Sequence, residues 1–157
     1  MTGIENPAPE SEDSDLAGVW SDHFDLSIRA ESTRAKVVLA ACYLDELLRQ
    51  LIALILKPVG ESHDSFLNGP NAPLGTFSSR IELVYRIGAI SEDTRKSLHF
   101  VRKIRNEFAH HLDKCDFDSP AVREWNKELR LLNDHVTPER HQKFSNGPIG
   151  DFEASVS

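Results

Sequence analysis

Three neighbouring side chains near residue 105 have the types needed to hold an anion and move a proton. Arg105 supplies a cation, Asn106 an amide and His110 an imidazole. An imidazole titrates near neutral pH and can act as a general acid or base, and a guanidinium binds anions through directed hydrogen bonds. Asn106 and His110 are four residues apart, so on a helix they share one face. Any chemistry at this site depends on how the helix that carries them is placed.

The helix expected over residues 91–112 has one apolar arc, and Arg105 projects inside it. Burying a charge without a partner is costly, so Arg105 needs a carboxylate. On the long helix expected from residue 33 to residue 56, Asp45 lies at the edge of the apolar arc and Glu46 points away from it. The sequence therefore predicts an Arg105–Asp45 ion pair.

The same residues also have a purely structural interpretation. Arg105 and Asp45 then form a structural ion pair, and His110 is an ordinary surface histidine. The two cysteines of the chain, with no CxxC or HExxH pattern, indicate neither a metal site nor a disulfide framework. We therefore expect no metal and no cofactor.

Helical signals extend over residues 15–136, and no stretch shows the alternation typical of strands. Helices are expected over about residues 15–29, 33–56, 76–88 and 91–112 and from residue 120, with a loop over 61–75. The expected fold class is all-α, a helical bundle of four main helices plus a short N-terminal helix. The expected domain organisation is a disordered acidic tail over residues 1–14, one bundle domain over 15–136 and a loose C-terminal tail over 137–157.

The net charge of −7 is concentrated at one end of the chain of 157 residues. Residues 1–28 contain seven acids and no Lys or Arg, which leaves 18 acids and 18 bases in the rest of the chain. Residues 86–105 carry six cations and two acids, a local net charge of +4 that is compatible with RNA. No apolar run is long enough to span a membrane and no signal peptide is visible, so we expect a cytoplasmic protein without membrane contact.

Longer motifs resemble two related groups of proteins. The segment RNEFAH at residues 105–110 resembles the R-N-x(3–5)-H signature of HEPN domains, which are small helical bundles, often dimeric. With it, GPNAPLGTFSSRIELVYRIG at residues 69–88 and CYLDELLRQLI at 42–52 look like the mannitol operon repressor family of bacterial proteins. The resemblance extends over about residues 16–133. It implies a HEPN-like bundle in the bacterial cytosol. The long helix expected from residue 33 to residue 56 is apolar around much of its girth, which indicates a central position or a dimer face, and we expect a homodimer.

The resemblance implies two alternative functions. The first is a small bacterial regulatory protein that acts on transcription through a protein partner, because the sequence contains no helix-turn-helix with a basic recognition helix for specific DNA reading. The alternative is a metal-independent endoribonuclease of the HEPN type, as a toxin or defence component.

In the ribonuclease alternative, Arg105 holds the scissile phosphate, Asn106 orients the site and His110 is the general acid or base. The 2′-hydroxyl group of the RNA is the nucleophile. One Arg105 cannot both pair with Asp45 and hold a phosphate, so this alternative expects a cleft shared by two copies of the chain.

Overall fold

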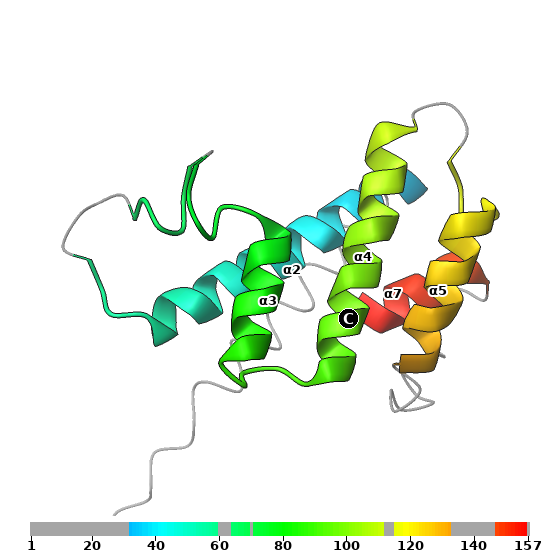
Figure 1. Ribbon diagram of the computed structural model, residues 1–157. Helices are drawn as coiled ribbons and strands as arrows, with labels where there is room; N and C mark the ends of the chain where they lie inside the picture. The colour runs from blue at the N-terminus through cyan, green and yellow to red at the C-terminus, as the bar shows by residue number, and fades with distance from the viewer. Residues whose placement is uncertain (1–31, 60–63, 70, 112–114, 133–146, 157) are drawn as a thin grey trace, which may run out of the picture. The chain divides into compact units, whose positions relative to one another are not determined.

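The computed structural model describes residues 32–59, 64–69, 71–111, 115–132 and 147–156, which all belong to one compact unit that begins at Ser32. The described residues form five helices and no strand (Figure 1). These helices are α2 (Thr33–Ile55), α3 (Phe77–Arg86), α4 (Glu92–His110), α5 (Pro120–Leu132) and α7 (Pro148–Val156). The all-α fold class expected from the sequence is confirmed. The acidic tail and the short N-terminal helix that the sequence predicts lie outside the described residues.

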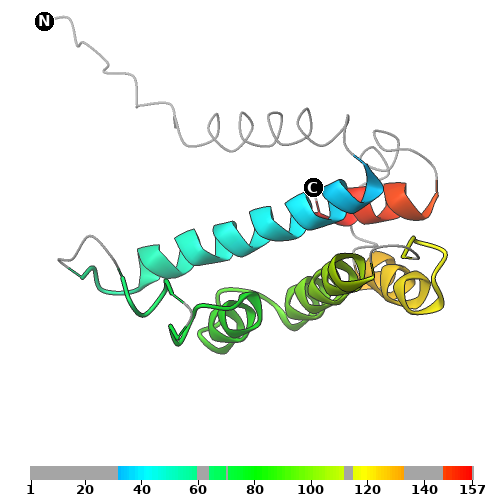
Figure 2. The same ribbon diagram turned by 90° about the horizontal axis from the view of Figure 1, so that it is seen from above.

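The helices are arranged in two layers (Figure 2). α2 and α7 lie side by side in one layer, and α3, α4 and α5 form the other. α4 packs against α2, α3 and α5, so it is the central element of its layer. The helix that carries the candidate site residues is therefore held in place from three directions.

The helices begin and end close to where the sequence predicts. Ser32, Thr76 and Ser91 cap α2, α3 and α4, each with a side-chain oxygen that accepts a hydrogen bond from an N–H group of the first turn. After α3, Gly88 has a φ of 76°, a left-handed conformation that glycine adopts without strain. These ends agree with the expected ones to within two residues because each is set by a local signal.

The four buried apolar residues of α4 are the ones that its sequence pattern indicates. They are Leu98, Val101, Ile104 and Phe108. Phe108 continues into an aromatic row, because its ring centroid lies 5.3 Å from that of Phe117. In the part of the chain that the structure describes, no helix is long and apolar enough to cross a membrane.

Residues 147–156 belong to the bundle, which corrects that part of the loose tail predicted over residues 137–157. Within the described part of that range, α7 packs against α5 and α2. Phe152 is 1% exposed, and its ring centroid lies 5.6 Å from that of Phe117. A Gly-Pro pair such as Gly147-Pro148 is a turn signal in a sequence, but proline is also favoured at the first position of a helix, where Pro148 stands here. Residues 137–146 lie outside the described part.

Two polar contacts hold α7 in this position. The Asn126 side-chain amide on α5 donates a hydrogen bond of 2.8 Å to the Pro148 carbonyl oxygen. Lys36 on α2 forms an ion pair of 2.9 Å with Glu153. The last helix is thus tied to both layers.

Candidate functional site on helix α4

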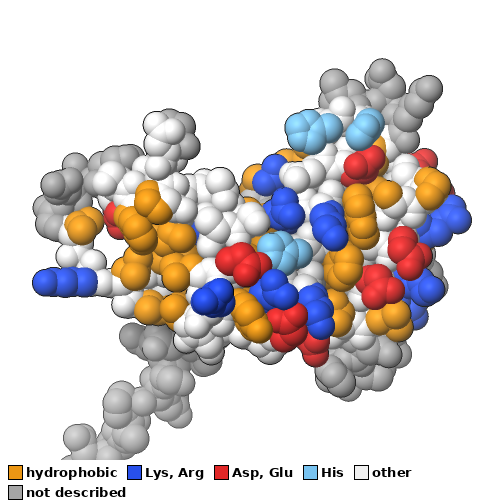
Figure 3. All heavy atoms as spheres, viewed as in Figure 1, with side chains coloured by type: hydrophobic (Ala, Val, Ile, Leu, Met, Phe, Trp, Pro, Cys, Tyr) orange, Lys and Arg blue, Asp and Glu red, His pale blue; other side chains and the backbone are white. Residues whose placement is uncertain are grey.

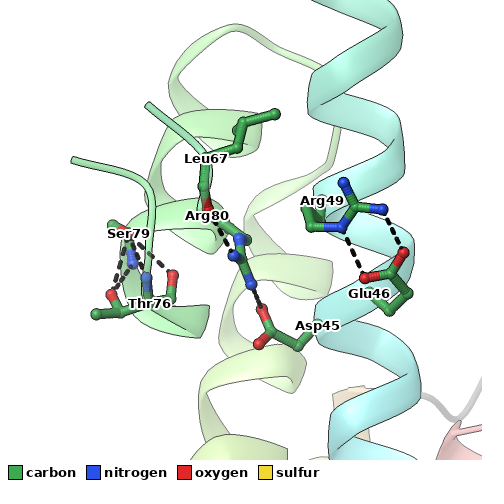
Figure 4. A network of polar contacts seen from close by, with 7 residues as sticks. All are labelled: Asp45, Glu46, Arg49, Leu67, Thr76, Ser79 and Arg80. Atoms are coloured by element: carbon green, nitrogen blue, oxygen red, sulfur yellow. Dashed lines mark hydrogen bonds and ion pairs between the residues drawn. The ribbon is translucent and has the colours of Figure 1, made fainter. Parts of the chain in front are cut away.

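Asp45 pairs with Arg80 and not with Arg105 (Figure 4). Arg80 Nη1 donates to Asp45 Oδ1 at 2.7 Å, and Nη2 donates to the Leu67 carbonyl oxygen at 3.1 Å. The Arg80 residue is only 8% exposed. The predicted Arg105–Asp45 ion pair is therefore wrong, and Arg80 is the buried cation that needed the carboxylate.

A signal for Arg80 was present in the sequence. At about 100° per residue, Arg80 lies within about 60° of Phe77 and Val84, both of which are buried. The helical projection that places Arg105 inside an apolar arc places Arg80 inside one too. Local periodicity thus offered two candidate cations for one carboxylate, and only the packing of α3 against α2 selected Arg80.

Arg105 is half-buried at the edge of the apolar face of α4. Its Nε atom is buried and has no hydrogen-bond partner, and the same is true of the Nε atom of Arg102. Among the described residues, no carboxylate forms an ion pair with Arg102, Lys103 or Arg105. One turn of α4 therefore carries three positive charges that form no ion pair with a carboxylate in the described part of the chain.

Asn106 and His110 lie on the outer side of the same helix. Asn106 is half-buried, and His110 is exposed as the last residue of α4. The two lie within about 40° of each other around the helix axis, whereas Arg105 lies about 140° from His110. The structure therefore brings Asn106 and His110 to one face and leaves Arg105 on the flank of the helix.

Arg34, a residue that the sequence did not indicate, fixes the end of α4. Its Nη1 atom donates to the Phe108 carbonyl oxygen, and its Nη2 atom donates to that of His111 at 3.0 Å. The last carbonyl groups of a helix lack partners within the helix and carry partial negative charge, so a guanidinium satisfies and stabilises them. The turn from which His110 projects is thus held by the first turn of α2.

A separate polar cluster neutralises the N-terminal half of α4. Glu82 on α3 accepts a hydrogen bond from Arg95 at 3.0 Å and lies 2.7 Å from His99 Nε2. Hydrogen bonds from His99 and Arg95 lower the pKa of Glu82, and the hydrogen bond from Arg95 lowers the pKa of Glu92 to about 2. Both carboxyl groups are therefore ionised at neutral pH and balance Arg95. The unbalanced positive charge of α4 lies in its C-terminal half.

The space-filling view shows the charged side chains of one face of the molecule, with some acidic side chains beside the histidines at the upper end and over the part where Figure 1 places α5 (Figure 3). Lys and Arg side chains gather over the part of the face where Figure 1 places α4, with acidic side chains beside them towards the start of the helix. Histidine side chains lie at the upper end, where α4 ends. Within the described ranges, no group of three or more His, Cys, Asp or Glu side chains is placed to hold a metal ion.

In comparisons with known proteins, no family model, no curated protein and no solved structure matches this chain. The resemblance to the mannitol operon repressor family and to HEPN domains therefore stays a prediction from the sequence.

Proposed function

We propose that this protein is a small bacterial regulatory protein that acts by contacting another protein and does not read DNA itself. The observation that supports the proposal is the outer face of α2. Leu39, Leu47 and Leu54 on this face are 42%, 41% and 85% exposed. Each projects about 140° or more around the helix axis from the buried Ile52. A row of exposed leucines is typical of a surface that contacts protein.

The polar side chains beside this leucine row neutralise one another. Arg49 forms an ion pair with Glu46 at 2.6 Å (Figure 4). Gln50 donates a hydrogen bond to the same carboxylate. The hydrogen bonds from Arg49 and Gln50 lower the pKa of Glu46 to about 2, so the pair is ionised at neutral pH. An apolar row with a charge-balanced rim suits a protein partner better than a nucleic acid.

Cross-linking tests this proposal directly. A photo-reactive amino acid at position 47 is expected to form an adduct with one defined protein in the host cell, and the same group at Arg86, an exposed position at the end of α3, is expected to form none. A Leu47→Asp change should reduce the adduct formed from position 39 by about ten-fold or more, because a charge disrupts a central apolar contact. The Leu47→Asp change should also alter the levels of a defined set of transcripts in the host cell.

Two outcomes are informative about the partner. An adduct with a second copy of the chain alone would assign the leucine row to the homodimer that the sequence predicts, which the structure of a single chain does not test. Sequence-specific binding of the purified protein to promoter DNA would contradict the proposal.

A second candidate function is metal-independent cleavage of RNA. The observation that favours it is that Arg105 makes no ion pair among the described residues. Asp45, the carboxylate that the sequence assigned to Arg105, pairs with Arg80. The guanidinium does not have to leave a carboxylate before it can hold a phosphate. The conflict between a structural and a catalytic role for Arg105 is thereby removed.

In this second candidate, the 2′-hydroxyl oxygen attacks the neighbouring phosphorus and the bond to the 5′-oxygen breaks. The products are a 2′,3′-cyclic phosphate and a 5′-hydroxyl group. His110 takes the proton from the 2′-hydroxyl or gives one to the leaving 5′-oxygen, and Arg105 stabilises the charge on the phosphate. Since Arg105 and His110 lie on different sides of one α4, the site requires His110 from a second copy of the chain.

Incubation of the purified protein with mixed RNA in EDTA tests this candidate. Wild type is expected to produce fragments with 2′,3′-cyclic phosphate ends. His110→Ala should lower the cleavage rate by about 100-fold or more, as loss of a general acid or base does. The neighbouring exposed His111 gives a matched control, since His111→Ala should leave the rate nearly unchanged. Equal rates for wild type and His110→Ala would show that the cleavage comes from a contaminant.

A further inference from the structure

We infer that one amphipathic helix of the partner protein packs along the C-terminal half of α2, on a flank formed by Leu47, Leu51 and Leu54. The name open seam is used for these three residues below. The inference rests on the proposed contact between the leucine row and another protein. It adds the secondary structure of the partner segment and the spacing of its contacts.

The three leucines have the spacing of a coiled-coil seam. Leu47, Leu51 and Leu54 are four and three residues apart, and Ala40 and Leu44 continue the same spacing one heptad earlier. Apolar residues at alternating intervals of four and three form a stripe that receives the side chains of a second helix as knobs into holes. The backbone groups of α2 are hydrogen-bonded within the helix, so the flank offers no edge to which an extended segment could pair.

The first part of this stripe is covered within the bundle, and the second part is open. Ala40 is 2% exposed and Leu44 is half-buried. Leu47 and Leu54 are 41% and 85% exposed, with the half-buried Leu51 between them. The intramolecular packing of α2 therefore uses only the N-terminal part of a seam that continues to the end of the helix.

Helix α7 indicates which kind of element fits this flank of α2. It packs beside the N-terminal part of α2, where its Glu153 forms the ion pair of 2.9 Å with Lys36 (Figure 2). Lys36 and Leu54 are 18 residues apart, which is about five full turns, so both project to the same side of α2. A partner helix on the open seam would continue the line that α7 begins.

Exposed apolar side chains are concentrated at this end of the molecule. Of the eight large hydrophobic residues that are exposed in the described part of the chain, five lie between Leu47 and Phe66. Figure 3 shows hydrophobic side chains gathered where Figure 1 places the end of α2 and the segment that follows it. Two copies of the chain joined through their open seams would overlap for about 10 Å of helix, which is short for a stable dimer. Another protein can extend the contact towards Phe66.

Photo-cross-linking from two positions of the open seam measures the rise per residue of the partner segment. Leu47 and Leu54 are about 10.5 Å apart along α2, since each helical residue rises 1.5 Å. A photo-reactive amino acid is placed at position 47 or 54 of the full-length chain in the host cell, and mass spectrometry locates the adducts. The two sites on the partner are expected to lie about seven residues apart. Ala53 is the control position, because it is exposed but projects about 100° away from Leu54, and it should give little adduct.

A peptide then tests the helix itself. The cross-linked partner segment, made as a labelled peptide of about 20 residues, should bind the wild-type protein in an anisotropy titration and gain helical circular dichroism on binding. Leu54→Asp is expected to weaken binding by about ten-fold or more, because a charge replaces a central apolar contact. Ala53→Asp adds the same charge to the neighbouring flank and should leave the affinity within about two-fold. Both positions are exposed, so both variants are expected to fold.

The spacing of the adducts separates this inference from the proposed function. Absence of any adduct from positions 47 and 54 would contradict both. Adducts about three residues apart on one defined protein would support the protein contact and overturn the helix, because an extended segment spans about 10 Å with three residues. Adducts with a second copy of the chain alone would overturn the inference in favour of a dimer. Binding to phosphatidylglycerol vesicles that Leu54→Asp abolishes would overturn it in favour of a membrane surface.

Discussion

Replacing Asp45 with alanine is expected to destabilise the protein by about 3 kcal/mol, because it leaves the Arg80 charge buried without a carboxylate. Arg80 is 8% exposed and, among the described residues, keeps only the Leu67 carbonyl oxygen as a hydrogen-bond partner after the change. The Asp45 side chain is 28% exposed, so water enters beside Arg80 and holds the loss near the lower end of the range for buried pairs. Urea unfolding followed by circular dichroism measures the loss of unfolding free energy.

A double-mutant cycle identifies the partner of Asp45. Asp45→Ala combined with Arg80→Met should recover much of the loss, because the second change removes the unpaired charge and keeps an apolar side chain. Asp45→Ala combined with Arg105→Met is the matched control, and its effects should add to within about 0.5 kcal/mol. Coupling between Asp45 and Arg105 in place of Arg80 would contradict the structure and restore the pair that the sequence predicts.

Phe152→Ala is expected to cost about 3–4 kcal/mol, the usual loss for a fully buried phenylalanine. Phe152 is 1% exposed, and its ring packs in a tilted arrangement against that of Phe117, which in turn contacts Phe108 of α4. The cavity left by the ring would lie in the aromatic row that joins α7 to the rest of the bundle. The same unfolding experiment measures the loss.

Phe66 provides the control for this prediction. It is 46% exposed, so Phe66→Ala removes the same side chain from a surface position and should cost less than about 1 kcal/mol. Equal losses of unfolding free energy for the two variants would show that α7 does not contribute a buried ring to the core. That result would agree with the loose C-terminal tail that the sequence predicts.

The candidate site was only partly predictable. The sequence places Arg105, Asn106 and His110 on one helix, and the structure does so too. The guanidinium of Arg34 at the end of that helix gives no local signal, because it lies 74 residues from Phe108 in the sequence. Contacts between residues this far apart in the sequence depend on how α2 crosses α4, and helical periodicity does not specify that crossing.

The sequence by itself determined the all-α class, the ends of α2, α3 and α4 and the buried face of α4. Each of these follows from interactions within a few residues, such as the Ser91 cap and the spacing of Leu98, Val101, Ile104 and Phe108. Only the tertiary structure decided that Asp45 pairs with Arg80 and that Phe152 is in the core. Arg80 and Arg105 both lie in apolar arcs, and Asp45 can pair with only one of them. The packing of α3 against α2 brings Arg80 to Asp45.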